Sequence, residues 1–176
     1  MVQRKINAII SLLATLFLLI HAIGVAVWML SKGSIPQFIP FAPWILAGLM
    51  VAHAFIGIDL LISDRQQGEQ RKYKIYAKKN GTTIFQRISG ILLVLFTALH
   101  IAGTAGPLQP PLVIHTILPP LFFATALAHT AVSVDKAFIT LGVGDAKFVK
   151  AVSVVTKVIC AATLVASVMG FYLYVW

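Results

Sequence analysis

The sequence predicts an all-α membrane protein with five transmembrane helices, of which the first four form a bundle. Two observations predict this fold class. The chain of 176 residues is 59% hydrophobic and only 11% charged, whereas a soluble domain of this size needs far more polar surface to cover its core. The apolar residues also fall into five long runs, and the charged residues lie almost entirely between these runs.

Each run has the length of roughly 20 residues that a helix needs to cross the hydrocarbon core of a bilayer. In order, the runs are Ile6–Leu30, Phe41–Ser63, Ile84–Thr104, Pro111–Val134 and Ala151–Val175. Turn-forming residues such as Gly, Pro, Asn and Ser separate consecutive runs. The sequence contains no Ser- or Pro-rich linker, so we expect residues 1–176 to form one domain.

Three of the runs have features of their own. Arg4 and Lys5 precede the first run as in a secretory signal, but the run is too long for a signal core, and we expect it to be retained. Pro119 and Pro120 lie inside the fourth run, where we expect a kink. Cys160, in the fifth run, is the single cysteine, which excludes an intramolecular disulfide and an iron–sulfur site within this chain.

The positions of the basic residues predict the orientation of the helices. The formal net charge is +9, and the basic residues occupy three clusters and one isolated position: residues 4–5, 65–87 and 136–157, and Lys32. This alternation follows the positive-inside rule, which places the N-terminus in the cytoplasm and the C-terminus, with its aromatic residues, outside. Because topology accounts for the charge, we expect membrane lipid around the chain and no nucleic-acid partner.

The histidines are the candidate functional residues. The longest hydrophilic segment, Asp64–Thr83, has about twenty residues and is too short for a catalytic domain, so any chemistry must lie within the bilayer or on a partner. Each of the first four helices carries at least one histidine: His21, His53, His100, His115 and His129. Ionisable residues inside a membrane are costly and usually functional. The alternative is that neutral histidines join helices through hydrogen bonds.

The depth of four histidines distinguishes these alternatives. At a helical rise of ~1.5 Å per residue, His21 and His100 lie about 22 and 24 Å from the inner ends of their helices. His53 and His129 lie about 9–15 Å from the inner side. The four therefore fall in two layers, which pair His21 with His100 and His53 with His129. Two haem groups, each held by two axial histidines and stacked across a four-helix bundle, require this arrangement.

Neighbouring residues favour haem b over other metals. Each of these four histidines has a small residue three or four positions away on the same helix face, which leaves room for a porphyrin edge. These small residues are Gly24, Gly57, Gly103 and Ala126, although such residues are also common in packed membrane helices. A zinc or di-iron site needs carboxylates or cysteines beside the histidines. Asp59, a candidate for proton uptake at the inner side, is the only acid inside a run.

Two motifs resemble those of a known family. Gln86-Arg87-Ile88-Ser89-Gly90, followed ten residues later by His100, is similar to the signature of the cytochrome b membrane-anchor subunit of succinate:quinone oxidoreductases and fumarate reductases. The segment His53–Ile58 resembles the second-helix ligand motif of the same family. The likeness is greatest to the single-subunit, five-helix, two-haem type, and it covers nearly the whole chain.

The resemblance implies that His21 and His100 hold an outer haem, and His53 and His129 an inner haem, the pairs that depth also predicts. It further implies the bacterial cytoplasmic (inner) membrane, and menaquinone or ubiquinone as substrate. An iron–sulfur subunit and a flavoprotein subunit are implied on the cytoplasmic side, with the basic segment Arg65–Lys79 as a candidate docking site. Succinate or fumarate chemistry then belongs to the flavoprotein, and this chain transfers the electrons.

Further candidate residues lie near the two ends of the helices. Arg87, at the inner end of the third helix, suits a haem propionate or a quinone carbonyl, and otherwise it is one more positive-inside residue. Thr83, Gln86 and Ser89 are candidates at the same place. The outer half contains no carboxylate, whereas some fumarate reductases use a glutamate at an outer quinol site. His115 is therefore the candidate for an outer quinone site, the alternative being a helix-end histidine that faces the interface.

Three other functions remain open from the sequence. The first is the same haem-binding architecture as the anchor of a different dehydrogenase, which changes only the partner. A small transporter or proton-path protein lined by histidines would contain no haem. A structural anchor that has lost one haem would bind one haem per chain instead of two.

Overall fold

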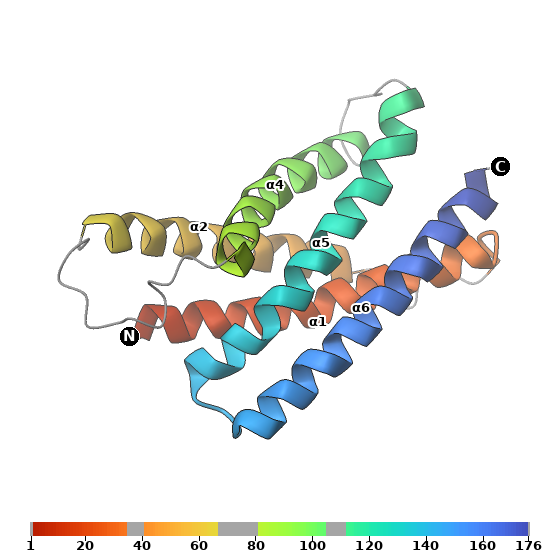
Figure 1. Ribbon diagram of the computed structural model, residues 1–176. Coiled ribbons are helices and arrows are strands. Elements are labelled where there is room, and N and C mark those ends of the chain that lie inside the picture. Colours follow the sequence, from red (N-terminus) through yellow and green to blue (C-terminus); the bar gives the residue numbers. More distant parts are fainter. Residues whose placement is uncertain (1, 35–40, 67–80, 105–111, 176) are drawn as a thin grey trace.

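The computed structural model describes residues 2–34, 41–66, 81–104 and 112–175, which form helices and their turns without any strand (Figure 1). The helices are α1 (Val2–Leu30), α2 (Ala42–Gln66), α4 (Gly81–Thr104), α5 (Leu112–Leu141) and α6 (Ala146–Val175). All five are long and apolar enough to cross a membrane, which confirms the predicted fold class. α5 is continuous through Pro119 and Pro120, and the kink expected there stays a prediction.

The helices extend beyond the apolar runs at several ends. α5 continues through Asp135 and Lys136 to Leu141, and α6 begins at Ala146, well before its apolar run. Hydropathy marks only the part of a helix that lies in hydrocarbon. The backbone hydrogen-bond ladder continues through charged residues until a cap or a turn residue ends it.

The turn between α5 and α6 has such caps on both sides. Gly142 adopts a positive φ of 72°, and the Val143 N–H donates to the Phe138 carbonyl at 3.2 Å, as in a Schellman motif. Asp145 Oδ1 then accepts a hydrogen bond from the Phe148 N–H at 2.7 Å and caps the N-terminus of α6. This tight turn makes α5 and α6 antiparallel neighbours.

Four of the helices form a ring around the interior. α1 packs against α2 and α5, α4 packs against α5, and α2 touches α4 at only a few positions. α1 and α4 are opposed across this ring, as are α2 and α5, and neither opposed pair makes close backbone contact in the described part of the chain. α6 packs on the outside, against α1 and α5 (Figure 1).

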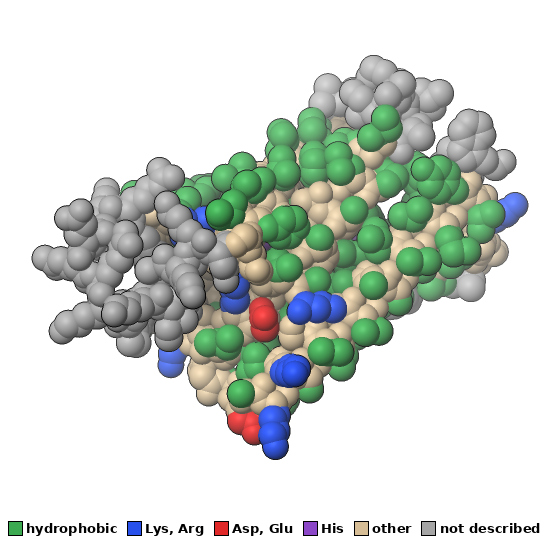
Figure 2. Space-filling view, in the orientation of Figure 1, with side chains coloured by type: hydrophobic (Ala, Val, Ile, Leu, Met, Phe, Trp, Pro, Cys, Tyr) green, Lys and Arg blue, Asp and Glu red, His purple; other side chains and the backbone are tan. Residues whose placement is uncertain are grey.

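Charge and hydrophobicity are separated on the surface. Apolar side chains cover the flank of the bundle in Figure 2, and some are largely exposed, such as Phe55 at 71% and Ile91 at 67%. The N-terminal ends of α1, α4 and α6 and the C-terminal ends of α2 and α5 all lie toward the left and lower left of the bundle in Figure 1. We call this the basic end, because most of the described basic residues lie there: Arg4, Lys5, Arg87, Lys136, Lys147 and Lys150.

Candidate functional site

Four half-buried histidines occupy the interior of the ring as two pairs. His21 on α1 and His100 on α4 are close enough for their rings to interact electrostatically. His53 on α2 and His129 on α5 interact in the same way. Each pair therefore joins two opposed helices through side chains, since the backbones of those helices are not in contact. The structure brings together the same pairs that depth predicts, and their role as iron ligands stays a prediction.

A hydrogen bond from α4 fixes the orientation of the His129 ring. Its Nδ1 lies 2.8 Å from the Ser89 hydroxyl oxygen, and Ser89 is only 2% exposed. The Ser89 hydroxyl donates its one proton to the Phe85 carbonyl at 2.7 Å, so it accepts from the His129 Nδ1–H. In this tautomer Nε2 carries the lone pair, which leaves Nε2 available to bind a metal.

Glycines provide space beside two of the histidines. A Cβ placed on Gly90 would lie 3.4 Å from Cε1 of His129, so a side chain at this position would press on the imidazole ring. A Cβ on Gly57, one turn from His53, would meet no described atom within 4 Å. The first glycine admits the ring of His129, and the second leaves open space on the helix face that carries His53.

The His53 ring differs from that of His129 in its hydrogen bonding. The ring has a hydrogen-bonding interaction with the backbone of Asn7 on α1. Its Nδ1 is buried and has no hydrogen-bond partner among the described residues. Because buried polar atoms are almost always paired in folded proteins, this atom marks a site that still needs an acceptor or a water.

Aromatic rings line the other pair. The Phe122 ring on α5 lies 5.3 Å from the His100 ring, at an interplanar angle of 39°. Phe96 packs edge-on against Phe122, with ring centroids 6.3 Å apart. Phe122 lies seven residues before His129 and thus on the same face of α5, so one face of this helix serves both histidine pairs. This spacing is the signal by which sequence reasoning could have found Phe122.

A polar cluster lies between α4 and α5 at the basic end. Lys136 Nζ donates a hydrogen bond to Gln86 Oε1 at 2.6 Å, and Lys136 also interacts electrostatically with Arg87 and with Asp135. Lys136 follows His129 by seven residues, which places both on one face of α5. Sequence reasoning treated Lys136 only as a topology determinant and missed this position, although the spacing was visible.

The remaining predicted residues make no contact with the histidine pairs that the structure describes, or are less completely described. Arg87 is exposed, and Thr83 is half-buried in the first turn of α4. His115 belongs to α5, but its side chain lies outside the described part. Of the segment Arg65–Lys79, the first two residues end α2, and residues 67–79 lie outside the described residues. Asp59 accepts a hydrogen bond from Gln3 Nε2 at 2.5 Å, which joins α2 to α1 at the basic end.

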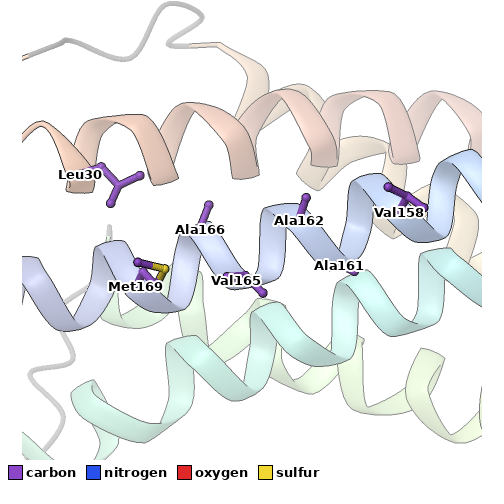
Figure 3. Close-up of a pocket in the computed structure, with 7 residues that line it drawn as sticks. All are labelled: Leu30, Val158, Ala161, Ala162, Val165, Ala166 and Met169. Atoms are coloured by element: carbon purple, nitrogen blue, oxygen red, sulfur yellow. The ribbon is translucent and has the colours of Figure 1, made fainter.

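Two further observations concern other kinds of site. An apolar groove lies between α1 and α6 (Figure 3), and its lining contains no titratable side chain: Leu30, Val158, Ala161, Ala162, Val165, Ala166 and Met169. Such a surface suits a lipid chain better than a reacting group. The described residues also contain no group of three or more His, Cys, Asp or Glu side chains that could hold a metal ion. Axial ligation of a haem iron requires only two.

Comparison of the chain with protein-family models, with curated proteins and with solved structures found no match.

Proposed function

We propose that this chain is a membrane-anchoring dihaem cytochrome b subunit that transfers electrons between membrane quinone and a cytoplasmic iron–sulfur and flavoprotein partner. The observation that carries the proposal is the pairing of His21 with His100 and of His53 with His129 across opposed helices. When bound, haem b supplies reversible one-electron transfer, which the protein tunes through ligands, hydrogen bonds and burial. By the motif resemblance, the partner is a succinate dehydrogenase or fumarate reductase.

The side chains of each pair suit the axial positions of a haem iron. The two imidazoles of each pair would hold the iron of a haem together with the porphyrin, and no protein carboxylate would be required. The Ser89 hydroxyl holds the His129 Nδ1–H at 2.8 Å, the contact that metal-bound histidines ordinarily make. The opposed helices leave the interior free of backbone contact, and the apolar helices around it exclude water.

The residues at the basic end suit anionic groups and the soluble partner. Lys136 and Arg87 lie close enough to repel each other, and an anion between them would relieve that repulsion. Lys136 and Arg87 would hold the propionates of an inner haem, which are anionic. From the positive-inside rule we expect the basic end to lie in the cytoplasm, where an iron–sulfur subunit would dock.

Replacing Lys136 by glutamine is expected to lower the midpoint potential of the inner haem without removing that haem. A cation favours the reduced iron, and Lys136 follows His129 by about 10 Å of helix. At that separation and an effective dielectric constant of ~20, the interaction is about 1.5 kcal/mol, roughly tenfold in the reduction equilibrium. A redox titration followed by absorbance measures the shift. Lys157→Gln, an exposed lysine on α6, is the control, and an equal shift in both variants would contradict the assignment.

Reduction by a quinol tests the function directly. The full chain is purified in detergent, oxidised, and mixed anaerobically with a water-soluble menaquinol or ubiquinol analogue. We expect sharp reduced visible bands of bis-histidine haem to develop in proportion to the quinol added. The control is the apoprotein, which is prepared from haem-deficient cells and treated in the same way. A colourless wild-type protein would support the histidine-lined transporter instead, and a haem protein that no quinol reduces would remove the quinone from the proposal.

A further inference from the structure

The two histidines of the basic-end pair differ in their supporting contacts. His129 Nδ1 is held by Ser89, whereas His53 Nδ1 is buried and unpartnered in the described part of the chain. A second buried atom there is also unpartnered, the side-chain oxygen Oδ1 of Asn7. His53 and Asn7 lie on adjacent helices, α2 and α1, and the His53 ring lies against the Asn7 backbone. A ring N–H is a donor and an amide oxygen is an acceptor.

Other polar side chains on this face of α1 are already engaged. Gln3, Asn7 and Ser11 are spaced by four residues and share one face of the helix. Gln3 donates to Asp59 on α2, and the Ser11 hydroxyl donates to the Ala8 carbonyl of its own helix at 2.8 Å. Asn7 is the member of this row whose side-chain oxygen is buried without a partner in the described part of the chain, and its backbone lies beside the His53 ring.

We propose that Asn7 is the positioning residue of His53. Its Oδ1 accepts a hydrogen bond from the His53 Nδ1–H, directly or through one water, and so directs Nε2 of His53 toward the haem iron. The inference rests on the proposed function, because a ligand is positioned only if there is an iron to bind. Both axial ligands of the inner haem would then have a polar side chain behind them, Asn7 on one side and Ser89 on the other.

Such a contact has a measurable consequence. A hydrogen bond at Nδ1 makes the imidazole a stronger donor to the metal, and stronger donation favours the oxidised iron. Removal of the acceptor should therefore raise the midpoint potential of the inner haem, and a stronger acceptor should lower it. A residue that only fills space between α1 and α2 would leave this potential unchanged when a leucine of similar shape replaces it.

The experiment compares the redox titrations of three variants of the full chain, each purified with its haems. Asn7→Leu keeps the shape of the side chain and removes the acceptor. We expect it to change the ratio of reduced to oxidised inner haem about tenfold, which is about +59 mV for one electron, and to leave the other haem unchanged. Asn7→Asp keeps an acceptor oxygen and should shift the same haem in the opposite direction. Ser11→Ala, on the same helix face, is the control and should shift neither.

The outcomes distinguish this inference from the proposed function. An unmoved potential in Asn7→Leu, with both haems retained, would overturn the role of Asn7 alone. If Asn7→Leu loses the inner haem, retention of that haem in Asn7→Asp supports the inference, and its loss in both variants overturns it. A wild-type protein without haem would contradict the proposed function and this inference together.

Discussion

Replacing His53 by alanine is expected to reduce the haem content from two haems to one per chain. The inner haem would then keep only one protein ligand, His129. Gly57, on the same face of α2 as His53, has no side chain that could replace the lost imidazole. A pyridine haemochrome assay, with the protein concentration measured independently, gives the ratio. His129→Ala should give the same result, since both residues serve one iron.

The fifth histidine offers the matched control for this experiment. His115→Ala removes an imidazole from the same protein but from neither pair, and we expect it to retain both haems. Full haem content in His53→Ala would exclude His53 as a ligand. Loss of haem in His115→Ala to the same extent would show that haem content responds to any lost histidine, and not to the pairing.

Replacing His100 by alanine is expected to remove the other haem. His100 faces His21 from the opposed helix, so its loss leaves one imidazole without an opposite ligand, and the Phe122 ring that contacts it offers no donor atom. The assay is again haem per chain, combined with a redox titration that identifies which haem remains. The remaining haem should have the potential that is lost in His53→Ala.

The double variant His53→Ala/His100→Ala tests whether these two histidines bind different haems. Because the proposed function assigns the two residues to different irons, we expect no haem at all in the double variant. In contrast, His21→Ala/His100→Ala should still retain one haem, since both residues serve the same iron. If His53→Ala and His100→Ala leave a haem of identical potential, the two histidines hold one iron and the predicted pairing is wrong.

Much of this architecture could be predicted from the sequence, for a simple physical reason. A helix must place about 20 apolar residues in hydrocarbon, so five such runs specify five helices. The fixed rise per residue also turns sequence position into depth, which is why His21 matches His100 and His53 matches His129. Ser89 could be named as a site residue because it belongs to a motif. The ends of the helices could not be predicted, because charged residues such as Lys136 continue α5 outside the apolar run.

Other residues at the site could not be predicted, because their contacts depend on which helix faces meet. The depth of a residue in the membrane does not specify this. Asn7 lies on a helix with no recognisable motif, and its relation to His53 becomes visible only when α1 packs on α2. Phe122 is one of eleven phenylalanines, and only the packing of α5 on α4 brings it against His100. A role for Lys136 at the site could not be predicted, since the positive-inside rule already explained a lysine at this position.

The haem-to-protein ratio of the wild-type chain is the most direct test of all, because the proposed function requires each imidazole pair that spans the ring to hold one iron. The full-length protein is expressed with haem available, purified in detergent and assayed as pyridine haemochrome against a quantitative amino-acid analysis. We expect two b-type haems per chain. A fully folded, membrane-inserted protein that carries no haem under these conditions would mean that the four histidines serve another purpose.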